Sequence, residues 1–479
     1  MTRARQALLA GALAQLIVGC TSPGAPDATA DSGSPDASPG DSDVETEAGP
    51  EAGPETGPET GPEAVPWVKV GPPRDAGVDR GSVPRVKVPP VRPDEPDEVP
   101  GLCFLTLDCG VAIPDEPKVP CRLQVSDTRG TSWYDGQAGV ELRGRSSLWF
   151  PKHQYSVELW DDSGADVDAD LLGFGADADW VVNGAWIDRA LMRNQFGFDT
   201  YIGMGGWAPQ SAACTLILDG AWLGIYFLSE RARRGEARID FPASDTGDGF
   251  IAVLDEGTGV VDFSPVGYGT WRLVSPRQED ATAEQIAGAS AWLLGWVAAL
   301  RSADVSDPET GIFAWVDEES AIDFVILEEL IKNNDAFYLS VHIWKEPGGR
   351  IRFSPWDLDL SLGQPIYNNN VPPEEWILYR PPWVARMAEV PGFREALARR
   401  WRELRSGVLS DEQVIERVER MRETLGDTVY ANFEVWPIEE IQFAGDQLPV
   451  VSSYDEEYER VLEWLPARLM WIDVHIAAW

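Results

Sequence analysis

The sequence predicts an α+β protein whose folded region has two lobes. Alternating apolar and polar residues indicate strands over about 101–280, whereas apolar residues at helical spacing dominate about 281–479. A hydrophobic content of 44%, with 21 Trp, is enough for a substantial core. The 479 residues could hold two or three domains or one large two-lobed domain. We expect one domain over 101–479, with a β-rich N-terminal lobe and a helical C-terminal lobe.

Residues 1–20 have the pattern of a bacterial lipoprotein signal. Two arginines near the start precede the apolar run 8–18, and Ile-Val-Gly-Cys at 17–20 fits a lipobox in which Cys20 becomes lipidated. An ordinary secretory signal or a short core helix is the alternative. Thr21 stands where an inner-membrane retention signal would place Asp, which favours an outer-membrane anchor. We therefore expect an extracytoplasmic protein that contacts the membrane through its lipid only.

Residues 21–100 predict a disordered acidic linker. EAGP and ETGP repeat in tandem over 47–62, and a proline-rich stretch follows over 72–100. Pro, Gly and like charges leave too little apolar surface to offset the entropy lost on ordering. The net charge of −40 also makes nucleic acid a poor partner, because phosphate contacts need basic surface.

Four cysteines remain after Cys20. In an exported protein, Cys103, Cys109, Cys121 and Cys214 favour two disulfides, with three possible connectivities. Their spacing lacks the CxxC pairs of a zinc site, and the chain has three histidines.

The strand patterns of the N-terminal half include two pairs. We expect strands at 102–107 and 122–125, a pair at 138–147 and 152–160 around Pro151, and a hairpin over 214–230 that turns at Asp219-Gly220. Residues 188–203 have helical spacing after an Asp188 cap. Further helices are expected at 283–303, 317–334, 392–407, 410–425 and 453–474.

Acidic residues flank a second predicted hairpin, 340–346 with 350–355. Asp335 precedes it, and Asp357 and Asp359 follow it in PWDLDLSLG. Phosphoryl transfer needs one carboxylate that orients the acceptor hydroxyl and another that holds Mg²⁺ against nucleotide phosphates. The alternatives are a helix-terminal cap or turn for Asp335 and a solvated strand-end acid for Asp357. Apolar neighbours of Asp357 favour a buried setting, where a carboxylate needs a cation or donors.

Such a site also needs a basic residue for the phosphates, usually held by an acid. Lys152 is the foremost candidate, both as a catalytic and as a phosphate-binding residue, and Glu230 could orient it. Each basic candidate taken alone is more often a surface or ion-pair residue, and Trp356 could stack on adenine or lie in the core. The further basic candidates are Arg143, Arg145 and Arg193, of which the first two would share one strand face.

Five blocks, in order, resemble the CotH kinase family of atypical protein kinases. They are RGRSS…PKHQYSVEL (143–159), DWVVNGAWIDRALMRN (179–194), LILDGAWLGIYFLSE (216–230), NNDAFYLS (333–340) and PWDLDLSLG (355–363). The resemblance spans roughly 100–410 and implies a kinase-like two-lobed fold that uses ATP and Mg²⁺. By position, Asp335 resembles the catalytic Asp, and Asp357, with Asp359 as helper, resembles the metal ligand.

The resemblance has one departure, which leaves two functions open. Ser340 stands where a kinase has the Asn that binds a second metal ion, and a hydroxyl is a poorer Mg²⁺ ligand than an amide oxygen. The first function is a kinase acting on Ser or Thr of envelope or extracellular proteins, with Ser/Thr-rich substrates. The second is a weakly active pseudokinase that serves as a surface binding or assembly module. A hydrolase has little support, because no GxSxG or HExxH motif occurs.

Overall fold

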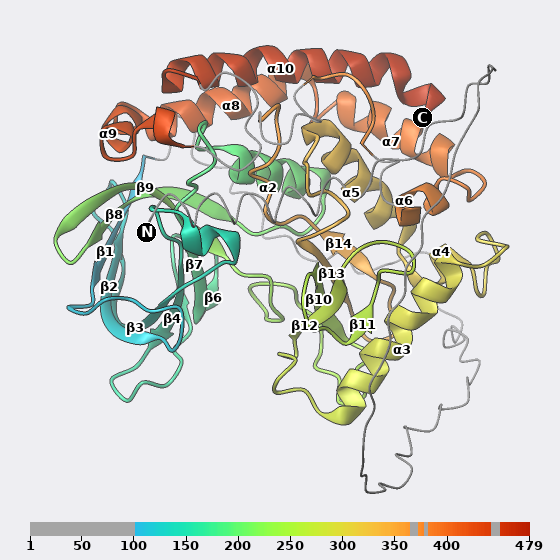
Figure 1. Cartoon of the computed structure of the whole chain (residues 1–479), viewed down its shortest axis with the longest axis horizontal. Coiled ribbons are helices and arrows are strands. Elements are labelled where there is room, and N and C mark those ends of the chain that lie inside the picture. The colour runs from blue at the N-terminus through green and yellow to red at the C-terminus, as the bar shows by residue number, and fades with distance from the viewer. Residues whose placement is uncertain (1–100, 365–371, 378–381, 442–450) are drawn as a thin grey trace, which may run out of the picture. The chain divides into compact units, whose positions relative to one another are not determined.

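The computed structural model describes residues 101–364, 372–377, 382–441 and 451–479, which all belong to the unit Gly71–Trp479. The expected signal, linker and Cys20 lie outside these residues. Mixed helix and strand content confirms the α+β class (Figure 1). In the described part, no helix is both long and apolar enough to cross a membrane.

The first half forms a closed barrel in the order β1-β2-β3-β4-β7-β9-β8, which differs from the N-terminal lobe of a typical kinase. Burial alternates along β1 and β2, so one face of each strand fills the interior. The barrel strands are β1 (Cys103–Asp108), β2 (Val119–Ser126), β3 (Ser132–Leu142), β4 (Tyr155–Trp160), β7 (Asp179–Asn183), β8 (Ser211–Leu218) and β9 (Ala221–Glu230).

Parallel pairing of β1 with β8 closes the barrel. Cys103 lies opposite Cys214 in this register, and the two form a disulfide. Cys109 and Cys121 form the second disulfide, which resolves the three open connectivities. The expected hairpin turn is also confirmed, because Asp219 and Gly220 both have positive φ, 48° and 79°.

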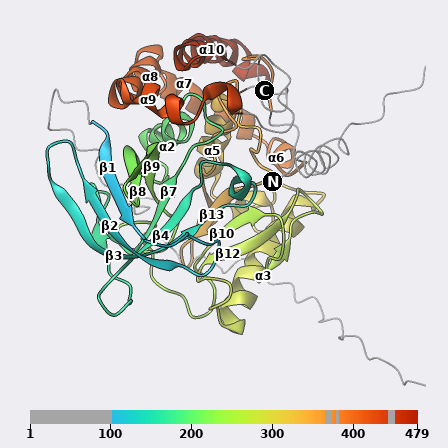
Figure 2. The same ribbon diagram turned by 60° about the vertical axis from the view of Figure 1, so that its left-hand side comes forward.

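A second sheet has the order β11-β12-β10-β13-β14. Its strands are β10 (Phe250–Asp255), β11 (Val261–Asp262), β12 (Thr270–Ser275), β13 (Val341–Lys345) and β14 (Arg352–Ser354); β5 (Ala169–Asp170) and β6 (Ala176–Asp177) form a separate pair. The hairpin of β13 and β14 confirms the one expected around 347–349. Because β10 pairs with β13, one sheet joins residues on both sides of the boundary expected near 280 (Figure 2).

The helices surround this second sheet and one end of the barrel. Five of them agree with the predicted ranges to within a few residues. The α-helices are α2 (Arg193–Met204), α3 (Ala283–Leu300), α4 (Ile312–Trp315), α5 (Glu318–Ile331), α6 (Pro382–Met387), α7 (Phe393–Arg405), α8 (Asp411–Leu425), α9 (Thr428–Val435) and α10 (Tyr454–His475). The 3-10 helices are η1 (Ser146–Trp149), η2 (Ile438–Glu440) and η3 (Ile476–Ala478).

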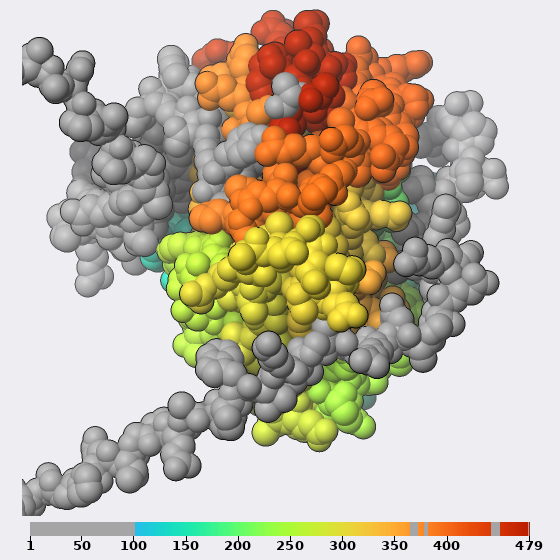
Figure 3. Space-filling view, turned by 90° about the vertical axis from the view of Figure 1, so that its right-hand side faces the viewer, coloured from blue at the N-terminus to red at the C-terminus, as the bar shows by residue number. Residues whose placement is uncertain are grey.

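Tryptophans fill the core between the second sheet and the helices. Trp296 of α3 lies 5.7 Å from both Trp271 of β12 and Trp383 of α6, measured between ring centroids. Such tilted and edge contacts add to the burial of large apolar side chains. At the surface, the yellow α3 segment borders the orange C-terminal helices (Figure 3). The interior of the barrel forms a second apolar core, which is separate from the core between the second sheet and the helices.

Candidate active site

Two backbone hydrogen bonds hold the acidic segments side by side. The amide of Asn334 donates to the carbonyl of Leu360 at 3.0 Å, and the amide of Leu362 donates to that of Ile331 at 2.8 Å. Helix α5 ends at Ile331, and the chain turns at Lys332 with φ 48°. Residues that flank the predicted hairpin are thus brought together at one place, as the sequence pattern indicated.

Asp335 lies in the turn after α5, and its carboxylate is available for chemistry. The Asp335 side chain does not act as a cap. Instead, the backbone amide of Asp335 donates to the side-chain oxygen of Asn333. The Asp335 carboxylate accepts no hydrogen bond from any residue that the structure describes. Its side chain is nevertheless half-buried. A half-buried carboxylate without a donor is costly unless it serves a ligand or a cation.

Asp357 is held in a strained backbone conformation beside Ser340. Both residues have left-handed φ, 58° and 56°, and the Ser340 hydroxyl donates to Asp357 Oδ2 at 3.4 Å. The next amide, of Leu358, donates to Asn194 Oδ1 at 2.6 Å. Gly197 of α2 makes room for Leu358, since a Cβ there would lie 2.2 Å from Leu358 Cδ1. Strain that the surroundings enforce is typical of functional sites.

Burial and mutual repulsion raise the pKa values of these acids. Burial, then the charges of Asp357 and Glu256, raises the pKa of Asp335 to about 7. Burial also raises the pKa of Asp357, which keeps part of its surface exposed to solvent. The pKa of Asp359 is raised well above its ordinary value by burial and by Asp357, Asp188 and Asp335. A cation bound among them would relieve the repulsion.

The donor set fits a Mg²⁺ ion that is shared with phosphates. Among the described residues, no group of three or more His, Cys, Asp or Glu is arranged to hold a metal by itself. Mg²⁺ bound in nucleotide sites takes one or two protein carboxylates, with phosphates and waters completing its six ligands. Asp357 and Asp359 are the two residues that would hold it here.

Arg193 lies beneath this cluster as a fully buried ion-pair centre. Its guanidinium binds the carboxylates of Asp188 and Glu457 and donates from Nε to the carbonyl of Ser361 at 2.8 Å. Asp188 also accepts the amides of Met192 and Arg193, so it fixes the turn before α2. The helix therefore begins four residues later than an Asp188 cap predicted. With every edge of its guanidinium occupied, Arg193 has a structural position rather than the expected phosphate-binding one.

The expected pairing of Glu230 with Lys152 is wrong. Lys152 is buried and its Nζ donates to the Ile225 carbonyl at 2.6 Å and to Asn432 Oδ1 at 3.0 Å. Glu230 instead binds Arg238 at 2.7 Å. Burial lowers the pKa of Lys152 to about 7. Lys152 thus ties β9 to α9, and its contacts give no support to a role at the phosphates.

Arg143 and Arg145 lie beyond the end of β3 and do not share a strand face. The Arg143 guanidinium lies 5.6 Å from the Trp356 ring centroid. Burial and the charge of Arg231 lower the pKa of Arg143 to about 10, and the charge of Asp357 partly offsets them. Arg145 is exposed and bound to Glu256 at 2.6 Å. Trp356 is half-buried beside His342, with ring centroids 5.1 Å apart, so it combines partial core packing with an accessible edge.

Sequence reasoning missed Asn194, Arg231 and Arg272. Asn194 closes a matched block, which was a usable signal, whereas Arg231 directly follows the hairpin block. Arg272 sits on a strand that no pattern had singled out. In the second sheet, Arg272 of β12 pairs with Val253 on one side of β10, and His342 of β13 pairs with Val253 on the other side.

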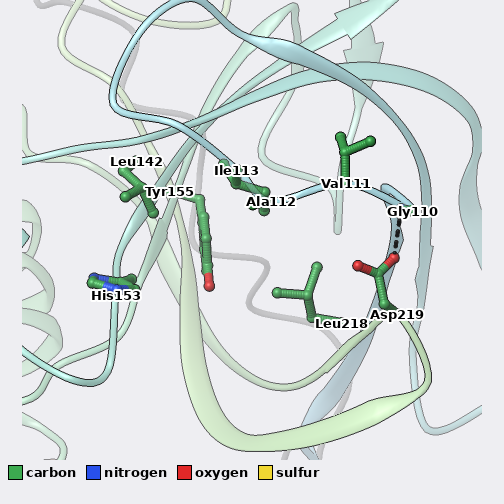
Figure 4. A pocket seen from close by; sticks show the side chains of 9 residues that line it. All are labelled: Gly110, Val111, Ala112, Ile113, Leu142, His153, Tyr155, Leu218 and Asp219. Atoms are coloured by element: carbon green, nitrogen blue, oxygen red, sulfur yellow. Dashed lines mark hydrogen bonds between the residues drawn. The ribbon is translucent and has the colours of Figure 1, made fainter.

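A separate cavity of about 500 Å³ opens at the end of the barrel (Figure 4). Mostly apolar residues line it, together with Tyr155, whose hydroxyl points between the other lining side chains, and His153 at one side (Figure 4). Asp219 fixes its rim by accepting the amides of Cys109 and Gly110. None of the site acids lines it.

The family model described as CotH kinase protein matches residues 140–472, and the chain belongs to this family. The match includes all five blocks and extends into α10. No curated protein matches the chain.

We predict that Asp335→Asn changes the pH dependence of stability. As the pH rises from about 4 to 7, Asp335 ionises in the unfolded chain but stays protonated when folded, so the wild type loses stability over that window. The midpoint difference between Asp335→Asn and wild type should grow from near zero at pH 4 to at least about 2 °C at pH 8 in metal-free calorimetry.

Asp162→Asn, in the exposed loop after β4, is the control and should show no such trend. A difference between Asp335→Asn and wild type that is the same at pH 4 and pH 8 would contradict the raised pKa.

Proposed function

We propose that this protein is a Mg²⁺- and ATP-dependent kinase that phosphorylates Ser or Thr of envelope or extracellular proteins. Family membership supports a kinase-like function. The observation that carries the finer proposal is that backbone hydrogen bonds place Asp335, whose carboxylate accepts no hydrogen bond from the described residues, beside the segment of Asp357 and Asp359.

Each residue has a distinct task in the proposed reaction. Asp335, with a pKa of about 7, accepts the proton of the acceptor hydroxyl. The oxygen of that hydroxyl forms a bond to the γ-phosphorus while the bond between this phosphorus and the bridging oxygen of the β-phosphate breaks. Asp357 and Asp359 would hold Mg²⁺, which would neutralise negative charge on the phosphates when bound. Arg143 stabilises negative charge on the transferring group. Ser340 orients Asp357 by hydrogen bonding.

A pseudokinase remains the second candidate because of Ser340. Its hydroxyl is directed at Asp357 rather than supplying the amide oxygen expected at a second metal. Such a site would bind one metal with nucleotide and turn over slowly, and the fold would serve as a binding module.

We predict that ATP with Mg²⁺ raises the thermal midpoint of the wild type and that Asp357→Ala abolishes the rise. Asp335→Asn should keep the rise but lower transfer of labelled phosphate to Ser/Thr-rich peptides by at least about 100-fold, because general-base catalysis contributes that much. Asp162→Ala is the matched control for both measurements.

Nucleotide binding without transfer in the wild type would favour the pseudokinase. Absence of both would contradict the proposed function altogether.

We also propose that the protein acts outside the cytoplasm, anchored by lipid on Cys20. Two disulfides in the barrel support an oxidising compartment. Metabolic labelling with a fatty acid should mark the wild type, whereas Cys20→Ala should lose the label and leave the membrane fraction. A label that persists in Cys20→Ala would contradict the anchor; Cys103→Ser, which changes a disulfide cysteine, is the control.

A further inference from the structure

Three arginines from separate elements lie close enough to His342 for their charges to act on it. Arg143 follows β3, Arg231 follows β9, and Arg272 lies on β12. Arg272 and His342 both pair opposite Val253, so they share one face of the second sheet two strands apart, about 10 Å. Trp356 connects His342 to Arg143, at 5.1 Å and 5.6 Å.

These cations are poorly compensated by the protein. Arg143 and Arg272 form no ion pair with the residues that the structure describes. The ion pair of Arg231 is long, 3.7 Å to Asp179, and Arg233 binds the same carboxylate more closely. Arg145, by contrast, is bound to Glu256 at 2.6 Å.

The cluster is unusual in a chain of net charge −40. Burial, with Arg272, Arg143 and Arg231 as neighbours, lowers the pKa of His342 to about 3, so the imidazole stays neutral. The charges of Arg143 and Arg231 also oppose each other. Like charges held close together favour a bound anion, and here Arg143 and Arg231 are half-buried while Arg272 is exposed.

We propose that Arg231 and Arg272 join Arg143 in a cradle for the triphosphate of the nucleotide. This inference rests on the proposed function, and it assigns to arginines the task that Lys152 and Glu230 do not perform. The Arg143 guanidinium lies 5.6 Å from the ring of Trp356, the residue before Asp357, so the cradle adjoins the carboxylate that would hold the metal. Guanidinium groups bind phosphate oxygens through paired hydrogen bonds, which suits a polyphosphate chain.

The test measures binding of Mg-ATP and of inorganic tripolyphosphate by calorimetry to the full chain and its variants. Arg231→Ala and Arg272→Ala should each weaken both ligands by about tenfold, because a charge-assisted hydrogen bond is lost. Arg143→Gln should also weaken binding of both ligands, although the glutamine side chain can still pack over Trp356. Arg234→Ala is the matched control, since this exposed arginine lies three residues after Arg231.

The outcomes separate the cradle from the kinase proposal. Arginine-dependent tripolyphosphate binding supports the cradle even if no phosphate is transferred. Wild-type affinity in folded Arg231→Ala and Arg272→Ala overturns the cradle while leaving the kinase proposal intact. Loss of affinity only for an acidic peptide, with ATP and tripolyphosphate unaffected, also overturns it. If the wild type binds neither phosphate ligand, both proposals fail.

Discussion

The buried guanidinium of Arg193 is the constraint on which the acidic site depends. It joins the turn at Asp188, the carbonyl of Ser361, 168 residues away, and Glu457 of α10, 264 residues away. Removing one partner of such a group leaves an uncompensated buried charge, which costs about 3–5 kcal/mol. The arrangement is therefore stable only when all three segments are in place together.

This requirement fixes the segment that carries Asp357 and Asp359. Arg193 holds it at Ser361, Asn194 holds it at Leu358, and the backbone bonds from Asn334 and to Ile331 attach it to the Asp335 turn. Acids that would otherwise separate are kept close, at the expense of raised pKa values. The acids are thus held in place in the absence of a ligand, as the proposed cation site would require.

Local signals predicted much of the fold and of the acidic site. Three elements could be predicted because their interactions are between neighbouring residues in the sequence. They are the Asp219-Gly220 turn, helix α8 with its Ser410 cap and the hairpin after Asp335. Closure of the barrel by β1 and β8 could not be predicted, because it joins residues 111 positions apart. The partners of Lys152, Glu230 and Arg193 are also distant in sequence. A basic residue in a matched block could therefore not be assigned to a phosphate or to a buried carboxylate until the fold was known.

We propose that Asp357 and Asp359 bind the metal and that the phosphates of a nucleotide lie beside them. A crystal structure with Mn²⁺ and a non-hydrolysable ATP analogue tests it directly, through the anomalous signal of manganese. We predict a manganese peak between Asp357 and Asp359 and the γ-phosphate facing Asp335. A peak elsewhere, or phosphates bound beside Lys152 or in the barrel-end cavity, would contradict the account.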